Sequence, residues 1–516
     1  MRPAITRRTI ALELQNQLVR YERQVARQTV QHEEVTEGVL SDLLPDLARI
    51  VDTSGTVFLR DWEVTQDELL LKCAAKVTVL YLTEEDSRLY CMEMPLSFTH
   101  RMEVRGVTPG CEVLCSVRLL SADARILGPR RAAIRLQAVL SPRVYVPAEE
   151  SCPVGVTDGE GVCLRYTALP YRAVMGAAYK NFTLVEDVDI PEDFGALQSV
   201  LRAELRLRET DVKLLPGRAV VKAEAELIAL CETVEGGSRR MQHRFGFSQM
   251  IDLAGAEEGL FPAVEFTLRS LELDPALDLS GDSRYLSLSA GVILNLELSR
   301  QEEIRVLSDL YGTRQEIRPS YRELRLYGSG EMQSCPASAR ERIEPAVAAV
   351  RILDWQVQVD TEAELLPEEG QGSLGTMVCL LYEGEDGGIY SASRRVPLRF
   401  ALTQAIPSAA VWADAPELSA VISGGGIDLR LEATVSLKTG EETAVTVVES
   451  MEPGEAYAPD GYTGLSVLLR RADGAESLWQ IAREYHVDAD ALSQANHLER
   501  DSIPESGALL LIPMRK

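Results

Sequence analysis

The side chains that most often carry out chemistry in proteins are few and scattered in this chain. Its 516 residues include five histidines, namely His32, His100, His243, His486 and His497. None of them has the H-x-x-x-H or H-E-x-x-H spacing that directs two imidazoles at one metal ion. The nucleophile-elbow, phosphate-binding and dinucleotide-binding motifs are also missing from the sequence. We therefore predict a protein that is not an enzyme and that needs no metal or other cofactor.

The nine cysteines do not form the pattern of a disulfide framework. Their number is odd, they are spread along the whole chain, and the closest pair is Cys111 and Cys115. No C-x-x-C pair of the zinc or redox type occurs. We expect free thiols that pack as small apolar side chains in a reducing compartment.

Charge and hydropathy exclude two classes of partner. The chain has 53 Lys and Arg against 79 Asp and Glu, a formal charge of -26, which opposes the phosphate contacts that dominate nucleic-acid binding. No apolar run approaches the roughly 20 residues that a transmembrane helix needs. The N-terminus also lacks the apolar core of a secretory signal. We expect no nucleic-acid partner, no transmembrane segment and a soluble, intracellular protein.

The C-terminal segment contains two predicted helices between two predicted strands. After a linker rich in proline and glycine at 451–464, Leu478, Ile481, Ala482 and Tyr485 follow the spacing of one helical face. Ser477, three residues before Gln480, has the spacing of a capping box at the start of that helix.

A second short helix is predicted over "DADALSQAN". Asp488 or Asp490 would cap its start, and Asn496 suits the left-handed position that closes a helix. Strands are expected at 465–471 and in the terminal "ALLLIP". The segment 465–516 is therefore predicted to be a small βααβ domain.

The sequence "SLWQIAREYHVDADALSQANHL", with the terminal "LLLIP", closely resembles a LysM domain. In that family two loops flank a shallow groove for N-acetylglucosamine polymers such as peptidoglycan or chitin. The resemblance implies a partner- or glycan-binding site here at Asp473, Gly474, Ala475, Glu476, Ser477, Leu478, Trp479, Asn496, His497, Leu498, Ile503 and Pro504.

The first loop departs from the glycan-binding pattern of that family. It reads "DGAES", where glycan-binding members usually have Gly-Asp-Thr, so Ala475 and Glu476 change the hydrogen-bonding groups of the groove. Trp479 lies one residue off the helical stripe, about 100° round the helix. Its ring either packs on the small core or joins Glu476, His497 and Ile503 in an exposed patch.

The rest of the chain repeats itself with a period near 150 residues. Tyr81, Cys231 and Tyr382 stand at the same place in three similar segments, each with the period-two alternation of a β-strand. An acidic or glycine-containing turn follows each of them. A return strand then carries the motif "PLSF", "RFGF" or "PLRF" that ends at Phe98, Phe247 or Phe400.

A second set of anchors supports the same period. The anchors are Tyr21, Tyr171 and Tyr321, with Ile50, Val200 and Val350 each 29 residues later. A period of this length indicates tandem domains, because solenoid repeats are much shorter. We predict a mainly β chain of three tandem antiparallel β-rich modules followed by the βααβ domain. The expected boundaries are 1–20 for an N-terminal segment, 21–170, 171–320 and 321–450 for the repeats, 451–464 for a linker and 465–516 for the last domain.

The paired strands, the acidic turn and "PLxF" resemble the SPOCS domain of endospore-forming Firmicutes, in three copies. SPOCS modules followed by a C-terminal LysM domain resemble the SipL-like spore coat proteins. The resemblance implies a non-enzymatic factor of coat assembly in the mother-cell cytoplasm. It would gather at the forespore surface or spore coat and bind a coat morphogenetic ATPase, or another coat base-layer protein, through its LysM domain.

Two other functions stay open at this point. A protein that binds peptidoglycan or cortex through the LysM domain would have to reach and retain glycan, so a glycan pull-down separates it from the coat factor. An enzyme targeted by a LysM domain would need an active site that the sequence does not display.

Overall fold

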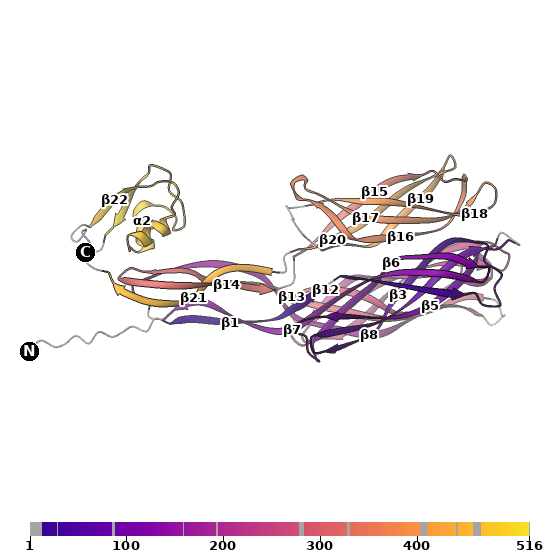
Figure 1. Ribbon diagram of the computed structural model, residues 1–516, viewed down its shortest axis with the longest axis horizontal. Coiled ribbons are helices and arrows are strands. Elements are labelled where there is room, and N and C mark those ends of the chain that lie inside the picture. Colours follow the sequence, from indigo (N-terminus) through magenta and orange to yellow (C-terminus); the bar gives the residue numbers. More distant parts are fainter. Residues whose placement is uncertain are drawn as a thin grey trace, which may run out of the picture.

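The protein is an elongated assembly of antiparallel strands that ends in a small domain with two short helices (Figure 1). The structure, a computed structural model, describes residues 13–27, 29–84, 88–157, 159–191, 194–277, 283–327, 331–402, 410–439, 442–457 and 466–514. The predicted fold class, mainly β with a C-terminal βααβ domain, is confirmed.

The first repeat forms a sandwich of two antiparallel sheets. One sheet has β2 (Val30–Val39), β7 (Arg131–Val156) and β6 (Glu112–Gly128), and the other has β3 (Arg49–Thr65), β4 (Glu68–Leu82) and β5 (Tyr90–Glu103). Alternate residues face inward, such as Val77 and Val79 of β4 against Ile134 and Leu136 of β7, and these four are fully buried. The period-two pattern of the sequence thus places one face of each strand in the core.

The second and third repeats contain the same elements. Repeat 2 pairs β8 (Val162–Asp189), β13 (Ser283–Gly312) and β12 (Phe261–Leu277) over β9 (Leu197–Leu215), β10 (Arg218–Thr233) and β11 (Ser238–Asp252). Repeat 3 has β15 (Glu331–Ile343), β20 (Gly426–Thr439) and β19 (Ala410–Ser423) with β16 (Ala349–Leu366), β17 (Gln371–Gly384) and β18 (Ile389–Ala401). Two rungs between β15 and β18 join its sheets into one.

The repeated residues occupy equivalent elements, as the sequence period predicts. Tyr81, Cys231 and Tyr382 lie on β4, β10 and β17. The three phenylalanines lie on the return strands β5, β11 and β18.

One sequence anchor in the third repeat was wrong. Ile50 pairs with Tyr81 and Val200 pairs with Cys231, but the residue that pairs with Tyr382 is Ile352. Val350, which the constant spacing selected, is 61% exposed. The spacing fails because repeat 3 has two more residues between its anchor tyrosine and this point of the strand.

The three repeats share a second structural unit, which we call the stalk. It consists of three strand pairs: β1 (Leu14–Arg27) with the second half of β7, the first half of β8 with the second half of β13, and β14 (Gln315–Tyr327) with β21 (Glu442–Ala456). One buried cluster takes side chains from all six strands, among them Tyr21, Cys152, Leu169, Val306 and Leu324, with Val447 from the last. The stalk is therefore built jointly by the three repeats.

The sandwiches also meet at equivalent positions, which places them around a common axis of approximate threefold symmetry. Val51, Leu201 and Leu353 stand at a bulge in β3, β9 and β16 and belong to one buried cluster. Each bulge rotates the next side chain toward the axis. These next residues are Asp52, Arg202 and Asp354, and they form a buried ionic triad.

Arg202 lies between the two aspartates of this triad. Its Nη1 is 2.5 Å from Asp52 Oδ2, and its Nε donates to Asp354 Oδ2 at 3.1 Å. The side chains of Arg202 and Asp354 are 5% and 3% exposed. Burial disfavours the charged guanidinium, but the two carboxylates outweigh it and raise the pKa of Arg202. Arg240 adds a further contact, with Nε 3.1 Å from Asp354 Oδ1.

The expected domain limits can be placed on these elements. Residues 21, 171 and 321 fall at equivalent points inside the stalk strands β1, β8 and β14. The boundaries expected from the sequence period therefore lie within strands and not between them. Residues 451–456 of the expected linker lie in β21, and 458–465 lie outside the described residues. The C-terminal domain contains β22 (Val467–Arg471), α1 (Leu478–Glu484), α2 (Ala489–Asn496) and β23 (Leu509–Pro513).

All nine cysteines are free thiols, as predicted. Burial raises the pKa of Cys73 and of Cys231 to about 12. Their thiols therefore stay protonated at neutral pH, and the thiolate is the form that reacts.

We expect Cys73 and Cys231 to react with iodoacetamide at pH 8 at least about a hundredfold more slowly in the native protein than in urea, because unfolding restores an ordinary thiol pKa. Peptide mass spectrometry after timed alkylation measures both rates. The half-buried Cys111 serves as an internal control that should react earlier. Equal native rates at the three cysteines would contradict this expectation.

Candidate binding site

The two helices of the C-terminal domain have the caps that the sequence predicts. The Ser477 side chain accepts from the Gln480 N–H while the Gln480 side chain accepts from the Ser477 N–H, which completes the capping box. Asp488 caps α2 by accepting from the Ala491 N–H at 2.9 Å. Leu478, Ile481 and Ala482 are buried as predicted, so the stripe forms the core of the domain.

The first loop, between β22 and α1, is held by its own aspartate. Asp473 Oδ1 accepts from the N–H groups of Ala475 and Glu476 at 2.8 and 3.2 Å. These backbone hydrogen bonds favour the charged carboxylate and lower the pKa of Asp473. Gly474 has φ of 84°, a conformation that favours glycine.

The second loop, after α2, differs from the sequence prediction at one residue. Asn496 was expected in the left-handed position, but His497 occupies it with φ of 56°. Asn496 remains helical because its side chain is tied to the terminal strand: Nδ2 donates to Leu511 O and Oδ1 accepts from Leu511 N–H. The amide therefore fixes the second loop to β23 instead of ending the helix.

The structure brings the two loops of the predicted site side by side. The Leu478 N–H donates to Ser502 O at 3.0 Å, and a Cβ added to Gly474 would lie 2.9 Å from Ser506 Cβ. Ile503 is 59% exposed and Leu498 is 36% exposed. His497, Gly474 and Ala475 are exposed, whereas Pro504 is buried.

Glu476 does not project freely from the first loop. Its carboxylate is paired with Arg470 of β22, and the same guanidinium also bonds Glu484 of α1. The Arg470 guanidinium carbon also lies over the ring of Tyr485, 5.5 Å from the ring centroid. The loop acid that replaces the usual polar residue is thus held in a local ion network.

Trp479 contacts the stalk, an arrangement that the sequence did not predict. The side chain is 1% exposed, its indole N–H donates to Asp309 Oδ2 at 2.8 Å, and its ring lies 4.8 Å from that of Tyr311. Both partners belong to β13. In this structure Trp479 does not join His497 and Ile503 in an exposed patch. Its ring packs in the core cluster of the C-terminal domain, which is the other alternative that the sequence left open, and it also contacts the end of the stalk.

Several polar contacts extend this interface between the C-terminal domain and the stalk. Arg483 lies 3.2 Å from Asp309, and the Tyr311 hydroxyl donates to Val487 O at 2.8 Å. Arg500, in the second loop, donates to the carbonyl oxygen of Leu164 at 2.7 Å. Arg165 and Asp501 form an ion pair at 2.9 Å. The rings of Tyr457 and His486 stack with their centroids 3.7 Å apart.

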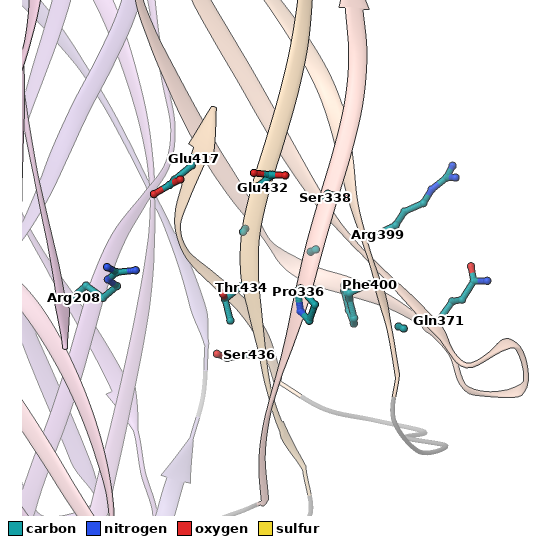
Figure 2. Close-up of a pocket in the computed structure, with 13 residues that line it drawn as sticks. Arg208, Pro336, Ser338, Gln371, Arg399, Phe400, Glu417, Glu432, Thr434 and Ser436 are labelled. Atoms are coloured by element: carbon teal, nitrogen blue, oxygen red, sulfur yellow. The ribbon is translucent and has the colours of Figure 1, made fainter. Parts of the chain in front are cut away.

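A separate groove of about 880 Å³ lies between repeats 2 and 3 (Figure 2). Arg208 of β9 lines one side, and Glu417, Glu432 and Thr434 of repeat 3 line the other, while Arg399 points away from them. Arg208 also lies 3.6 Å from Glu224 on its own sheet. None of the predicted site residues lines this groove, and its mixed charges do not select one class of ligand.

Two features are absent from the described residues, a cluster of metal ligands and a long apolar helix. In that part of the chain, no three His, Cys, Asp or Glu side chains are grouped to hold a metal ion. Among the helices that the structure describes, none is long and apolar enough to cross a membrane.

Comparison with known proteins gives two matches. Residues 46–127, which span β3 to β6 of the first repeat, match the family model described as SipL, SPOCS domain. Residues 475–513 match the model of the LysM domain. No curated protein and no solved structure matches the chain. The two matches confirm the LysM resemblance and, in the first repeat, the SPOCS resemblance; neither is to an enzyme family.

Proposed function

We propose that this chain, a sporulation-related protein that combines a SipL-type SPOCS domain with a C-terminal LysM domain, is a non-enzymatic assembly factor of the spore coat. Its LysM domain would bind a protein of the coat base layer, such as a coat morphogenetic ATPase. The pairing of the two domains in one chain is the observation that carries this proposal. The other two repeats, which share the strand order of the first, would act as SPOCS-like modules of the same scaffold.

The first loop supports a protein partner for the LysM domain. In the loop, the N–H groups of Ala475 and Glu476 are already engaged by Asp473, so they are not available to the hydroxyl or acetamido groups of a sugar. The loops instead present Ile503 and Leu498, whose exposed apolar surface suits contact with a protein.

The cellular location in this proposal follows from the partner. A factor that binds the coat base layer would act in the mother-cell cytoplasm and collect at the forespore surface or in the coat. The nine free thiols suit a reducing compartment. Fluorescence microscopy of a tagged chain in sporulating cells tests the location, and a signal outside the mother cell would contradict it.

We expect Glu476→Ala and His497→Ala each to weaken capture of a purified coat base-layer protein by about tenfold, or about 1.4 kcal/mol. Both residues lie in the loops and outside the buried stripe, so the domain should remain folded. The local costs are small ones, loss of the Glu476 pairing with Arg470 and alanine in place of His497 at φ of 56°. Pull-down with the full-length chain, paired with circular dichroism, gives binding and fold together.

Glu505→Ala is a matched control, since Glu505 is an exposed acid of the second loop. Full capture by both loop variants would remove these residues from the site. Loss of capture by the control as well would indicate a general charge effect.

The alternative function is binding of peptidoglycan or cortex, because the LysM domain is of the peptidoglycan-binding type. Calorimetric titration with chitin oligomers separates the two functions. Micromolar affinity for the oligomers, without capture of a coat protein, would establish the alternative.

A further inference from the structure

The contact between the LysM domain and the stalk has the composition of a recognition site. Its centre contains Trp479, Tyr311 and Arg500, with the Arg500 guanidinium 5.0 Å from the centroid of the Trp479 ring. Tryptophan, tyrosine and arginine are the side chains that dominate binding energy at protein interfaces. Trp479 and Tyr311 are only 1% and 2% exposed, and both belong to one buried cluster that joins the core of the LysM domain to the end of the stalk.

The docked domain is attached through a short tether. Ten residues separate the end of β21 at Ala456 from the start of β22 at Val467, a span of up to about 33 Å when extended. Contacts between domains of one chain resemble transient protein interfaces, and relative motion is their default. Docking is favoured because the tether keeps the effective concentration high, in the millimolar range. Because relative motion is the default at such contacts, the docked domain exchanges with a released state.

The stalk shows which chemistry fits the covered face of the LysM domain. Asp309 and Tyr311 are two residues apart on β13, so both side chains point to the same side of the strand. Asp309 accepts from the Trp479 indole and pairs with Arg483, while the Tyr311 ring packs on Trp479. A carboxylate and an aromatic ring on one strand thus complement an indole flanked by two guanidinium groups.

We propose that the end of the stalk is an intramolecular inhibitor of the LysM domain. Docking covers a protein-binding face, made of Trp479, Arg483 and Arg500, whose external partner presents an acidic and an aromatic side chain. This inference rests on the proposed function in one respect, that the LysM domain binds protein. The loops that carry Gly474, His497 and Ile503 remain exposed in the docked state. Release of the domain adds a second face to them.

The docked state is tested by trapping it with a disulfide in the full-length chain. Cys163 of β8 lies with its Sγ 3.8 Å from Asp488 Oδ2, so Asp488→Cys brings a second thiol to the interface. We expect oxidation with copper phenanthroline to link residues 163 and 488 within one chain at every protein concentration. Asp488→Ser, which keeps a capping side chain, controls for the loss of the carboxylate.

Two variants make the trapping result decisive. Glu484→Cys places a thiol on the exposed side of α1 that faces Arg470, and it should not link to Cys163. Tyr311→Ala, combined with Asp488→Cys, should slow linking about tenfold, which corresponds to a tenfold lower docked population. Equal linking at 484 and 488, or no linking at 488, would overturn the proposal.

Inhibition is tested with a fluorescent peptide of stalk residues 305–313, RVLSDLYGT, which carries the acidic and aromatic pair. We expect fluorescence anisotropy to show binding to the Tyr311→Ala chain, at least about tenfold weaker binding to the wild type, and none to the oxidised Asp488→Cys chain. A peptide with alanine in place of both Asp309 and Tyr311 should not bind. Equal affinity for the open and locked chains, or no binding to the open chain, would overturn the inhibitory role.

The experiments separate failure of the inhibitor proposal from failure of the proposed function. If the locked and open chains behave as expected with the peptide but neither captures a coat base-layer protein, the proposed function fails and the inhibitor stands. If both chains capture the coat protein equally, the proposed function stands and the inhibitor fails.

Discussion

Replacing Arg202 by alanine is expected to lower the free energy of unfolding by about 3–5 kcal/mol, because it leaves buried carboxylates without their counter-charge. Asp354 is 3% exposed and Asp52 is 15% exposed at the side chain. In the variant, Arg240 still pairs with Asp354. Among the described residues, no arginine or lysine other than Arg202 pairs with Asp52. Urea denaturation followed by circular dichroism measures the change.

Two further variants test whether the ionic triad is the cause. Arg208→Ala, on the same strand, removes an arginine whose side chain is 63% exposed, and it should change stability by less than about 0.5 kcal/mol. Changing Asp52, Arg202 and Asp354 together to leucine, methionine and leucine should recover much of the loss, since apolar replacement of a buried ion group is often neutral. Arg240 is changed to methionine in the same variant, because its guanidinium would otherwise lose Asp354 as its partner. A loss for Arg202→Ala no larger than for Arg208→Ala would contradict the role of the triad.

The second large effect is expected in the stalk, where Leu324→Ala should cost about 2–5 kcal/mol through lost burial and a residual cavity. Leu324 is 0% exposed and packs in the cluster that all three repeats build. Although Leu324 belongs to repeat 3, the loss should lower the stability of the stalk strands of repeats 1 and 2 as well. Hydrogen exchange of β1 and β8, measured by mass spectrometry, reports that spread.

Glu323→Ala is the control for the stalk variant. Glu323 is the preceding residue, its side chain is 52% exposed, and its pairing with Arg325 is worth little at the surface. Faster exchange in Leu324→Ala that is confined to β14 and β21 would show that the three stalk pairs are independent units.

The sequence predicted the features that rest on local patterns. Alternation identified the strand of Tyr81 and its two counterparts, and the helical stripe of Leu478 and Ile481 placed the LysM core. The capping box at Ser477 also follows from side-chain spacing alone. Short-range chemistry decides such elements, so their residues suffice to predict them.

The contacts that organise the whole molecule were not predictable in the same way. Trp479 and Tyr311 are 168 positions apart, and an aromatic residue on an alternating strand indicates only burial, without naming its partner. Arg202 differs in residue type from Asp52 and Asp354, so comparison of the repeats by similarity does not reveal that the three meet. The bulge before each of them is set by pairing across the sheet, which the sequence does not encode in any local motif.

The ionic triad has a consequence for how such a chain arose. If three identical subunits surrounded the axis, symmetry would place the same residue at all three positions, as in any closed ring of copies. Three aspartates there would repel one another, and so would three arginines. Fusion of the copies into one polypeptide frees each position to mutate alone. A single chain with three repeats can therefore place two acids and one base around the axis, whereas a homotrimer of identical subunits cannot.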